Sequence, residues 1–476
     1  MTTPPARPVP TSTTARTTEP TTSPSSSPGP RITASVAWRA VGQEALSLLT
    51  ITGRLLRRYS LVLTGIAALG IIAAHWISVL AVIASRGSAT AGILVFALVP
   101  GAAFVTAVGM LVLMGRLTDA TQRSAASALA TFASALLLYL VLYEQNGQLT
   151  EDRRVYLYET TMEAVYESAF NDDAPSALDR IPEVLSVSVL GILVVALVLR
   201  SLGAAFLDRQ ERRDEIAREQ HRTRGRGATI GTGALRVVVT YSELVWLVLS
   251  VLAAVAVGNA LRNWWSSRSA VHAVSDAWAR LDWPQVAPAI GAVGGVVGTL
   301  VEFAVAGVLV PAGWLAFGTV LYGTRRGATA ALASRAAEVT ASLGSRVAVP
   351  RAADALTDVA RLQRSWSSLV RPTSRWGPLG GAAGLVLARG WLPIGVFCIL
   401  FTILAQADYL VWWLADLLLP TVAANDWRAI YPLVAAVGTV LVQVLTLALV
   451  AAGTELTMRR LGLPSILRLP HKSKDQ

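Results

Sequence analysis

The sequence predicts an all-α integral membrane protein, a helix bundle that crosses the bilayer about eight times with both termini in the cytoplasm. Eight long apolar stretches alternate with more polar connections, and each stretch can cross a hydrocarbon core of ~30 Å as a helix. Of the 41 Lys and Arg residues, eight lie in one set of alternate connections and the remaining 33 lie in the other set and the termini. Because cytoplasmic loops carry the excess of basic residues, the richer set is predicted to be cytoplasmic.

Composition agrees with this fold class and limits the partners. The chain is 53% hydrophobic and 15% charged, which is unlike a soluble domain. Its net charge of +11 comes from the same inner connections, so we expect anionic lipid headgroups as partners and no nucleic acid. The bias of Arg over Lys, with abundant Ala and Val, is typical of a high-GC bacterial genome and therefore predicts a bacterial plasma membrane.

The chain begins with a segment rich in Pro, Ser and Thr, residues 1–32, which has too little apolar surface to fold and is expected to be a disordered cytoplasmic tail. Residues 33–58 are predicted to form an amphipathic helix on the cytoplasmic surface, with its Arg residues facing headgroups. The membrane domain follows at 59–458, and residues 459–476 form a cytoplasmic C-terminal tail. The predicted spans are 60–84, 92–114, 124–143, 184–206, 236–261, 297–322, 391–415 and 430–454.

Two outer connections, 144–183 and 262–296, carry sequence with helical periodicity. Val155, Tyr158, Met162, Val165 and Ala169 recur on one face of a helix predicted at 151–170. A second helix is predicted at 268–283. Its residues Trp278 and Trp283 are candidates for an outer groove that binds lipid, although Trp also simply marks membrane interfaces.

The inner connections, 200–236 and 325–390, are rich in Arg. Such loops ordinarily bind anionic headgroups, which is the first expectation for both. The longer loop, 325–390, is also a candidate docking region for a cytoplasmic or cell-envelope protein partner.

Polar residues within predicted spans are the strongest indication of a functional site, because each is costly in hydrocarbon and needs a partner or water. The candidates for a substrate or ion site in the outer half of the membrane are Glu302, Asp408, Gln406, Gln443 and His75. The functional interpretation is a cation or proton site that the carboxylates provide. The structural interpretation is hydrogen bonding to neighbouring helices or contact with outer water. Glu243 and Glu455 lie closer to the cytoplasmic ends of their spans and are expected to be interfacial charges paired with Arg.

Helix-breaking residues supply a second indication. Pro288, Gly291, Gly294, Gly295 and Gly298 precede the sixth span, and Pro311 interrupts it. A bent or re-entrant entry would resemble the discontinuous helices that line transport sites. Close packing of small residues between helices explains the same pattern without a site.

These features favour a transporter or permease for a small or lipid-linked solute. The alternative is a non-catalytic scaffold or subunit of a cell-envelope complex, which would use the tail, the inner loop and the outer helices. An enzyme is the weakest interpretation, because no paired catalytic residues, phosphate-binding Gly loop or zinc-type His pair occurs. No cofactor is predicted. The lone Cys398 excludes an intramolecular disulfide and a multi-thiolate metal site.

Overall fold

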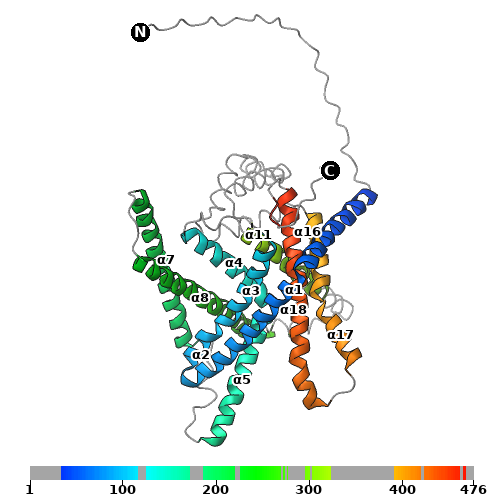
Figure 1. Ribbon diagram of the computed structural model, residues 1–476. Helices are drawn as coiled ribbons and strands as arrows, with labels where there is room; N and C mark the ends of the chain where they lie inside the picture. The colour runs from blue at the N-terminus through cyan, green and yellow to red at the C-terminus, as the bar shows by residue number, and fades with distance from the viewer. Residues whose placement is uncertain are drawn as a thin grey trace, which may run out of the picture. The chain divides into compact units, whose positions relative to one another are not determined.

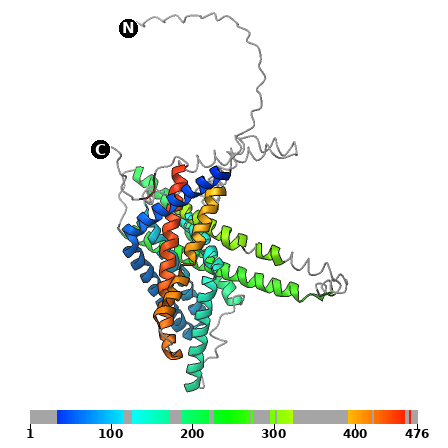
Figure 2. The ribbon, with the colours of Figure 1, turned by 90° about the vertical axis from the view of Figure 1, so that its right-hand side faces the viewer.

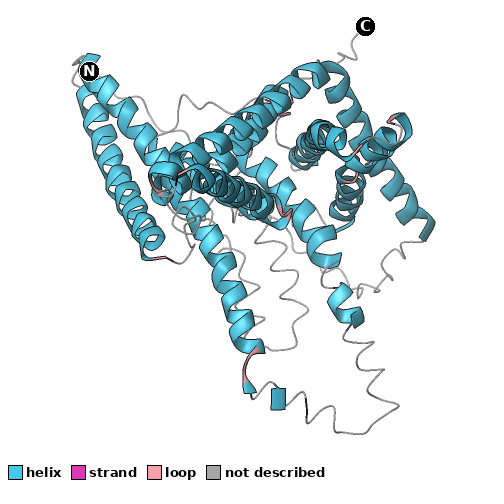
Figure 3. Ribbon diagram, turned by 90° about the horizontal axis from the view of Figure 1, so that it is seen from below, coloured by secondary structure: helices cyan, strands magenta, loops and turns pink. Residues whose placement is uncertain are grey.

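The computed structural model is helical throughout the part of the chain that it describes. That part comprises residues 34–115, 125–171, 186–219, 226–269, 272–273, 276, 295–300, 303–322, 391–419, 423–460 and 465–467. Figure 3 shows only helices and loops there, and the one β-type pairing is an isolated antiparallel bridge between Gly115 and Leu467. The chain divides into two compact units, Met1–Ala40 and Val41–Gln476, and the bundle belongs to the second.

The first helix is continuous across the predicted boundary between a surface helix and a span. α1 runs from Ala34 to Gly87, 54 residues without interruption, so the helix predicted at 33–58 is not a separate element. Its buried positions follow a helical stripe through both parts. The stripe includes Glu44, Leu48, Ile51, Leu55, Leu63, Ala67, Ala81 and Ser85. Because the same face packs along the whole length, the sequence offers no reason for a break near Tyr59.

The remaining helices follow the predicted spans closely (Figure 1). Only Ser88 separates α1 from the next helix, and Ala97 marks a bend within the second span. The outer helix predicted at 151–170 is present as α5. The bounds are α2 Ala89–Phe96, α3 Leu98–Met114, α4 Ala125–Gln145, α5 Gln148–Phe170, α7 Val187–Glu219, α8 Arg226–Ser266, η2 Val305–Leu309, α11 Val310–Tyr322, α16 Trp391–Ala405, α17 Asp408–Leu418 and α18 Ala424–Arg460.

Seven helical segments among the described residues are long and apolar enough to cross a membrane, and they indicate a multi-pass membrane protein. They correspond to every predicted span except the third. That span falls in α4, of which Phe132–Gln145 is a shorter apolar helix. The eight crossings and their orientation therefore remain predictions.

The centre of the bundle lies where α3, α4, α11, α16 and α18 pack together (Figure 2). Aromatic rings from four of these helices meet there. The ring of Phe104 lies 5.4 Å from that of Tyr139, Tyr139 lies 5.7 Å from Phe317, and Trp314 lies 6.4 Å from Phe401. Large buried rings dominate such a core because each buries a large apolar area.

α5 packs in a way that its apolar periodicity does not suggest. Its buried residues are Leu149, Tyr156, Thr160 and Ala164. The predicted apolar face is exposed instead, with Tyr158 at 64% and Val165 at 53% exposure. The apolar periodicity therefore predicted the helix correctly, but a different face of that helix packs against the bundle.

Candidate functional site

The seventh predicted span is interrupted at Gln406 and Ala407. α16 ends at Ala405 and α17 begins at Asp408. Around this break the backbone N–H groups of Gln406, Ala407, Tyr409 and Leu410 each donate to the carbonyl three residues earlier, at 3.2–3.3 Å. These tighter bonds replace the usual spacing of four residues, so the helix narrows and turns where Asp408 starts the next segment.

Asp408 packs against α18. A Cβ added to Gly438 would lie 3.4 Å from the Cβ of Asp408, so Gly438 permits a close approach of the two helices. Asp408 is half-buried there, and Gln406 is exposed. The predicted partner Gln443 is half-buried, but it follows Gly438 by five positions and so lies about 140° around α18 from it. Asp408 therefore packs against one face of α18, and Gln443 lies on another face of the same helix.

The other candidate residues do not join this group in the described structure. His75 is exposed on α1, and its ring contacts that of its neighbour Trp76 at 6.2 Å. Glu302, Trp278 and Trp283 lie outside the described residues, as do the helix-breaking run 288–294 and the inner loop 325–390. The convergence of Glu302 with Asp408 accordingly stays a prediction.

A second interruption lies beside α16. Residues Val305–Leu309 form the π-helix η2, which ends against α11, and the N–H of Val310 donates to the carbonyl of Val305. The thiol of Cys398 on α16 donates to the carbonyl of Val308 at 3.7 Å. The sequence predicted a discontinuity in this span from Pro311, and the structure places it one turn earlier. π-Helical turns occur frequently at functional sites.

Trp314 lies between the two interruptions. It follows η2 by five residues, and its ring stacks on Phe401, five residues before Gln406. Its indole N–H is buried and has no acceptor among the residues that the structure describes. A buried donor without a partner is costly, so the N–H is available to a water molecule or a ligand. Periodicity alone would not have distinguished this Trp from the other core aromatics.

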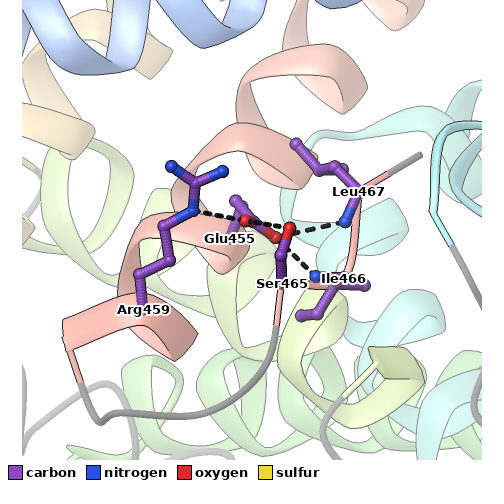
Figure 4. Close-up of polar contacts among 5 residues, drawn as sticks. All are labelled: Glu455, Arg459, Ser465, Ile466 and Leu467. Carbon is purple, nitrogen blue, oxygen red and sulfur yellow. Dashed lines mark hydrogen bonds and ion pairs between the residues drawn. The ribbon is translucent and has the colours of Figure 1, made fainter. Parts of the chain in front are cut away.

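Glu455 forms a second polar centre, at the end of the bundle where α3, α11 and α18 finish (Figure 4). We call this end the Glu455 end. The carboxylate is fully buried, and each of its oxygens accepts two hydrogen bonds. Oε1 accepts from Nε of Arg459 at 2.5 Å and from Oγ of Ser465 at 2.6 Å. Oε2 accepts from the backbone N–H groups of Ile466 at 2.7 Å and Leu467 at 3.2 Å.

The expected pairing of Glu455 with Arg is thus present, but the sequence did not indicate that Glu455 also binds the C-terminal tail. The neighbouring Arg460 pairs with Glu44, which joins α18 to α1. The other interfacial acid, Glu243, pairs with Arg200 on α7, a residue at the start of the Arg-rich connection 200–236 that was predicted to bind headgroups. Both partners are distant in sequence, so only tertiary packing identifies them.

On α5, Asp152 accepts a hydrogen bond from the hydroxyl of Tyr143 on α4 at 2.7 Å. Burial raises the pKa of Asp152 to about 6, although the Tyr143 hydrogen bond opposes the shift. Among the described residues, no group of three or more His, Cys, Asp or Glu side chains is arranged to hold a metal ion.

The chain matches no known family model, and comparisons with curated proteins and with solved structures found no significant similarity.

Proposed function

We propose that the protein transports a small or lipid-linked solute across the membrane, with Asp408 as an ion-binding or proton-binding carboxylate. The observation that carries the proposal is the interruption of an apolar helix at Gln406–Ala407, immediately before that carboxylate. A departure from regular helix at membrane depth needs local hydrogen bonds, neighbouring helices or water to satisfy its backbone groups, and it is found where a segment lines a path for water or substrate.

The contact between η2 and α16 supports the same function. The π-helix η2 contacts α16 through Val308 and Cys398, and α16 ends at the break eight residues after Cys398. The indole N–H of Trp314 has no acceptor among the described residues, and it lies where α11 packs against α16. It can donate to a passing solute. The substrate class that fits is a solute with a hydrogen-bond acceptor, moved together with a cation or proton that Asp408 binds.

Proton flux into proteoliposomes tests the proposal without knowledge of the solute. Purified protein would be reconstituted with a pH-sensitive dye inside the vesicles, and a potassium gradient with valinomycin would impose a membrane potential. We expect protein-dependent acidification that Asp408→Asn reduces at least tenfold. Asp416→Asn is the matched control, because Asp416 is an exposed carboxylate on the same helix, away from the break.

Folded protein that gives no flux, or the same flux in Asp408→Asn as in the parent, would contradict the proposal. The scaffold interpretation would then be the better one. Size-exclusion profiles and thermal melts of each variant in detergent establish that the loss of a carboxylate has not unfolded the bundle.

A further inference from the structure

The last described residues of the chain, 465–467, return to the bundle as a short extended segment that we call the strap. Its Ser465 side chain and two of its backbone N–H groups all donate to the single buried carboxylate of Glu455 (Figure 4). Ile466 and Leu467 are buried, at 9% and 5% exposure. The strap is therefore bound by one acidic group and by two apolar side chains.

The strap also connects two helices, and a third is attached next to it. Leu467 forms a β-bridge with Gly115, the residue that ends α3. The ring of Tyr322, the last residue of α11, lies within 2.4 Å of where a Cβ on Gly115 would be, so only glycine fits beneath it. The Tyr322 hydroxyl donates to the carbonyl of Leu111 on α3. With Glu455 on α18, the strap thus holds together the ends of α3 and α18, and Tyr322 attaches the end of α11 to α3 beside it.

Ser465 differs from its two neighbours because it is exposed. We propose that Ser465 is a phosphorylation site and that its phosphorylation releases the strap. In the reaction a protein kinase transfers the γ-phosphoryl group of a nucleoside triphosphate to Oγ of Ser465. The bond between the γ-phosphorus and its bridging oxygen breaks, the nucleoside diphosphate leaves, and the hydroxyl proton passes to solvent.

The geometry makes the strap sensitive to this one change. The Ser465 hydroxyl is the donor to Oε1, and a phosphate group at pH 7 offers acceptors in its place. It would also bring a charge of about −1.5 to −2 next to a buried carboxylate. Arg459, the cation bound to Glu455, already donates to the same oxygen. Loss of the Ser465 bond and repulsion act together, and the two backbone bonds are broken as the strap leaves.

Release of the strap depends only on contacts at the Glu455 end. The effect of that release on activity rests on the proposed function. A transport cycle separates and rejoins helix ends, and the strap would hold the ends of α3 and α18 together at the predicted cytoplasmic side. Phosphorylation would therefore increase transport by removing a restraint.

Cysteine labelling of the full-length protein in detergent tests the release. Leu467→Cys places a thiol in the buried strap, and a polyethylene-glycol maleimide adds one gel shift when it reacts. The native Cys398 is buried in α16 and reports unfolding by a second shift. We expect Ser465→Glu to accelerate the first shift at least tenfold, with no second shift. The added negative charge would itself slow thiolate formation, so an increase must come from exposure.

Two control variants isolate the cause. Ser473→Glu adds the same charge eight positions further along the tail and should leave the labelling rate unchanged. Ser465→Ala removes the hydrogen bond without adding charge and should raise the rate less than Ser465→Glu. Peptide mapping of the protein from its own membranes should find phosphate on Ser465.

An unchanged labelling rate in Ser465→Glu would overturn the proposal, as would rapid labelling of the parent, or a mapped Ser465 peptide without phosphate. None of these measurements uses flux, so failure of the strap and failure of the transport proposal are distinguishable. Flux that depends on Asp408 but is unaffected by Ser465→Glu would overturn only the regulatory consequence.

Discussion

Arg200 on α7 and Glu243 on α8 form an ion pair inside two apolar segments, and the Arg200 guanidinium also lies 5.0 Å from the centre of the Trp246 ring. Glu243 is 1% exposed and the Arg200 side chain 20% exposed. Each charge offsets the cost of burying the other, and the ring face adds a cation–π contact. The two helices lie side by side in Figure 1, and this pair fixes their register.

Breaking the pair on one side should destabilise the protein strongly. Glu243→Gln leaves a guanidinium without its counter-charge, and we expect a loss of about 3–5 kcal/mol in the free energy of unfolding. Replacing both residues, with Arg200→Met and Glu243→Leu, should recover most of that loss because no unpaired charge remains. Denaturant titration in mild detergent measures both. A single variant as stable as the parent would show that the pair contributes nothing.

A close approach of the same two helices makes a separate prediction. A Cβ on Gly203 would lie 2.2 Å from a methyl carbon of Val239, so Gly203→Ala should push α7 and α8 apart. We expect a loss of about 1–3 kcal/mol, partly restored by adding Val239→Ala. Gly191→Ala is the control in the same helix, since a Cβ there meets nothing within 4 Å. Equal melting temperatures for the two alanine variants would contradict the prediction.

Stability should fall as the pH rises, because the buried Asp152 carboxyl then loses its proton in the folded protein. Burial raises the pKa of Asp152 from 3.8 to about 6, so between these values the folded state holds a proton that the unfolded state has released. Its contribution to stability is largest at low pH and is lost as the pH rises through about 6, by about 3 kcal/mol at most.

The measurement for Asp152 is the difference between parent and variant. Melting temperatures at pH 4.5 and pH 7 would be compared with those of Asp152→Asn, which keeps an acceptor for Tyr143 but does not titrate. The parent should lose more stability than the variant over this interval. Parallel pH profiles would indicate that Asp152 is ionised in the folded protein at both values.

The predicted orientation is tested by labelling single introduced cysteines in intact cells. Tyr158→Cys on α5 and Arg213→Cys on α7 both replace exposed residues, and Cys398 is buried. A membrane-impermeant maleimide should label the first from outside and the second only after lysis. Labelling of Arg213→Cys in intact cells would show that the predicted topology is wrong.

The helices could be predicted from the sequence because each depends on a long apolar run. The length of such a run is set by the hydrocarbon thickness, and its periodicity is a local property of the sequence. The break at Gln406–Ala407 could not be predicted, because neither residue is a glycine or proline and a change to bonds spaced three residues apart leaves no signature in the sequence.

The polar site was harder to predict than the helices. Hydropathy indicated that Asp408 and Gln443 were unusual in their spans, but not which face of a helix each would occupy. Glu455 was predicted to be a charge paired with Arg near a helix end, whereas three of its four hydrogen bonds come from the tail segment 465–467. Arg200 was overlooked because it is close to a basic loop in sequence, and only its partner on α8 shows its importance.

The length of α1 has a mechanical consequence. Glu44 near one end pairs with Arg460, and Arg86 at the other end pairs with Glu163 on α5. Forty-two positions of uninterrupted helix separate the two attachments, a distance of about 63 Å. Such a helix is stiff along its axis, so a shift of α18 at one end would be transmitted to α5 at the other as a displacement of the whole rod. Events at the two ends of α1 can therefore be coupled through one helix, without any rearrangement of the aromatic centre.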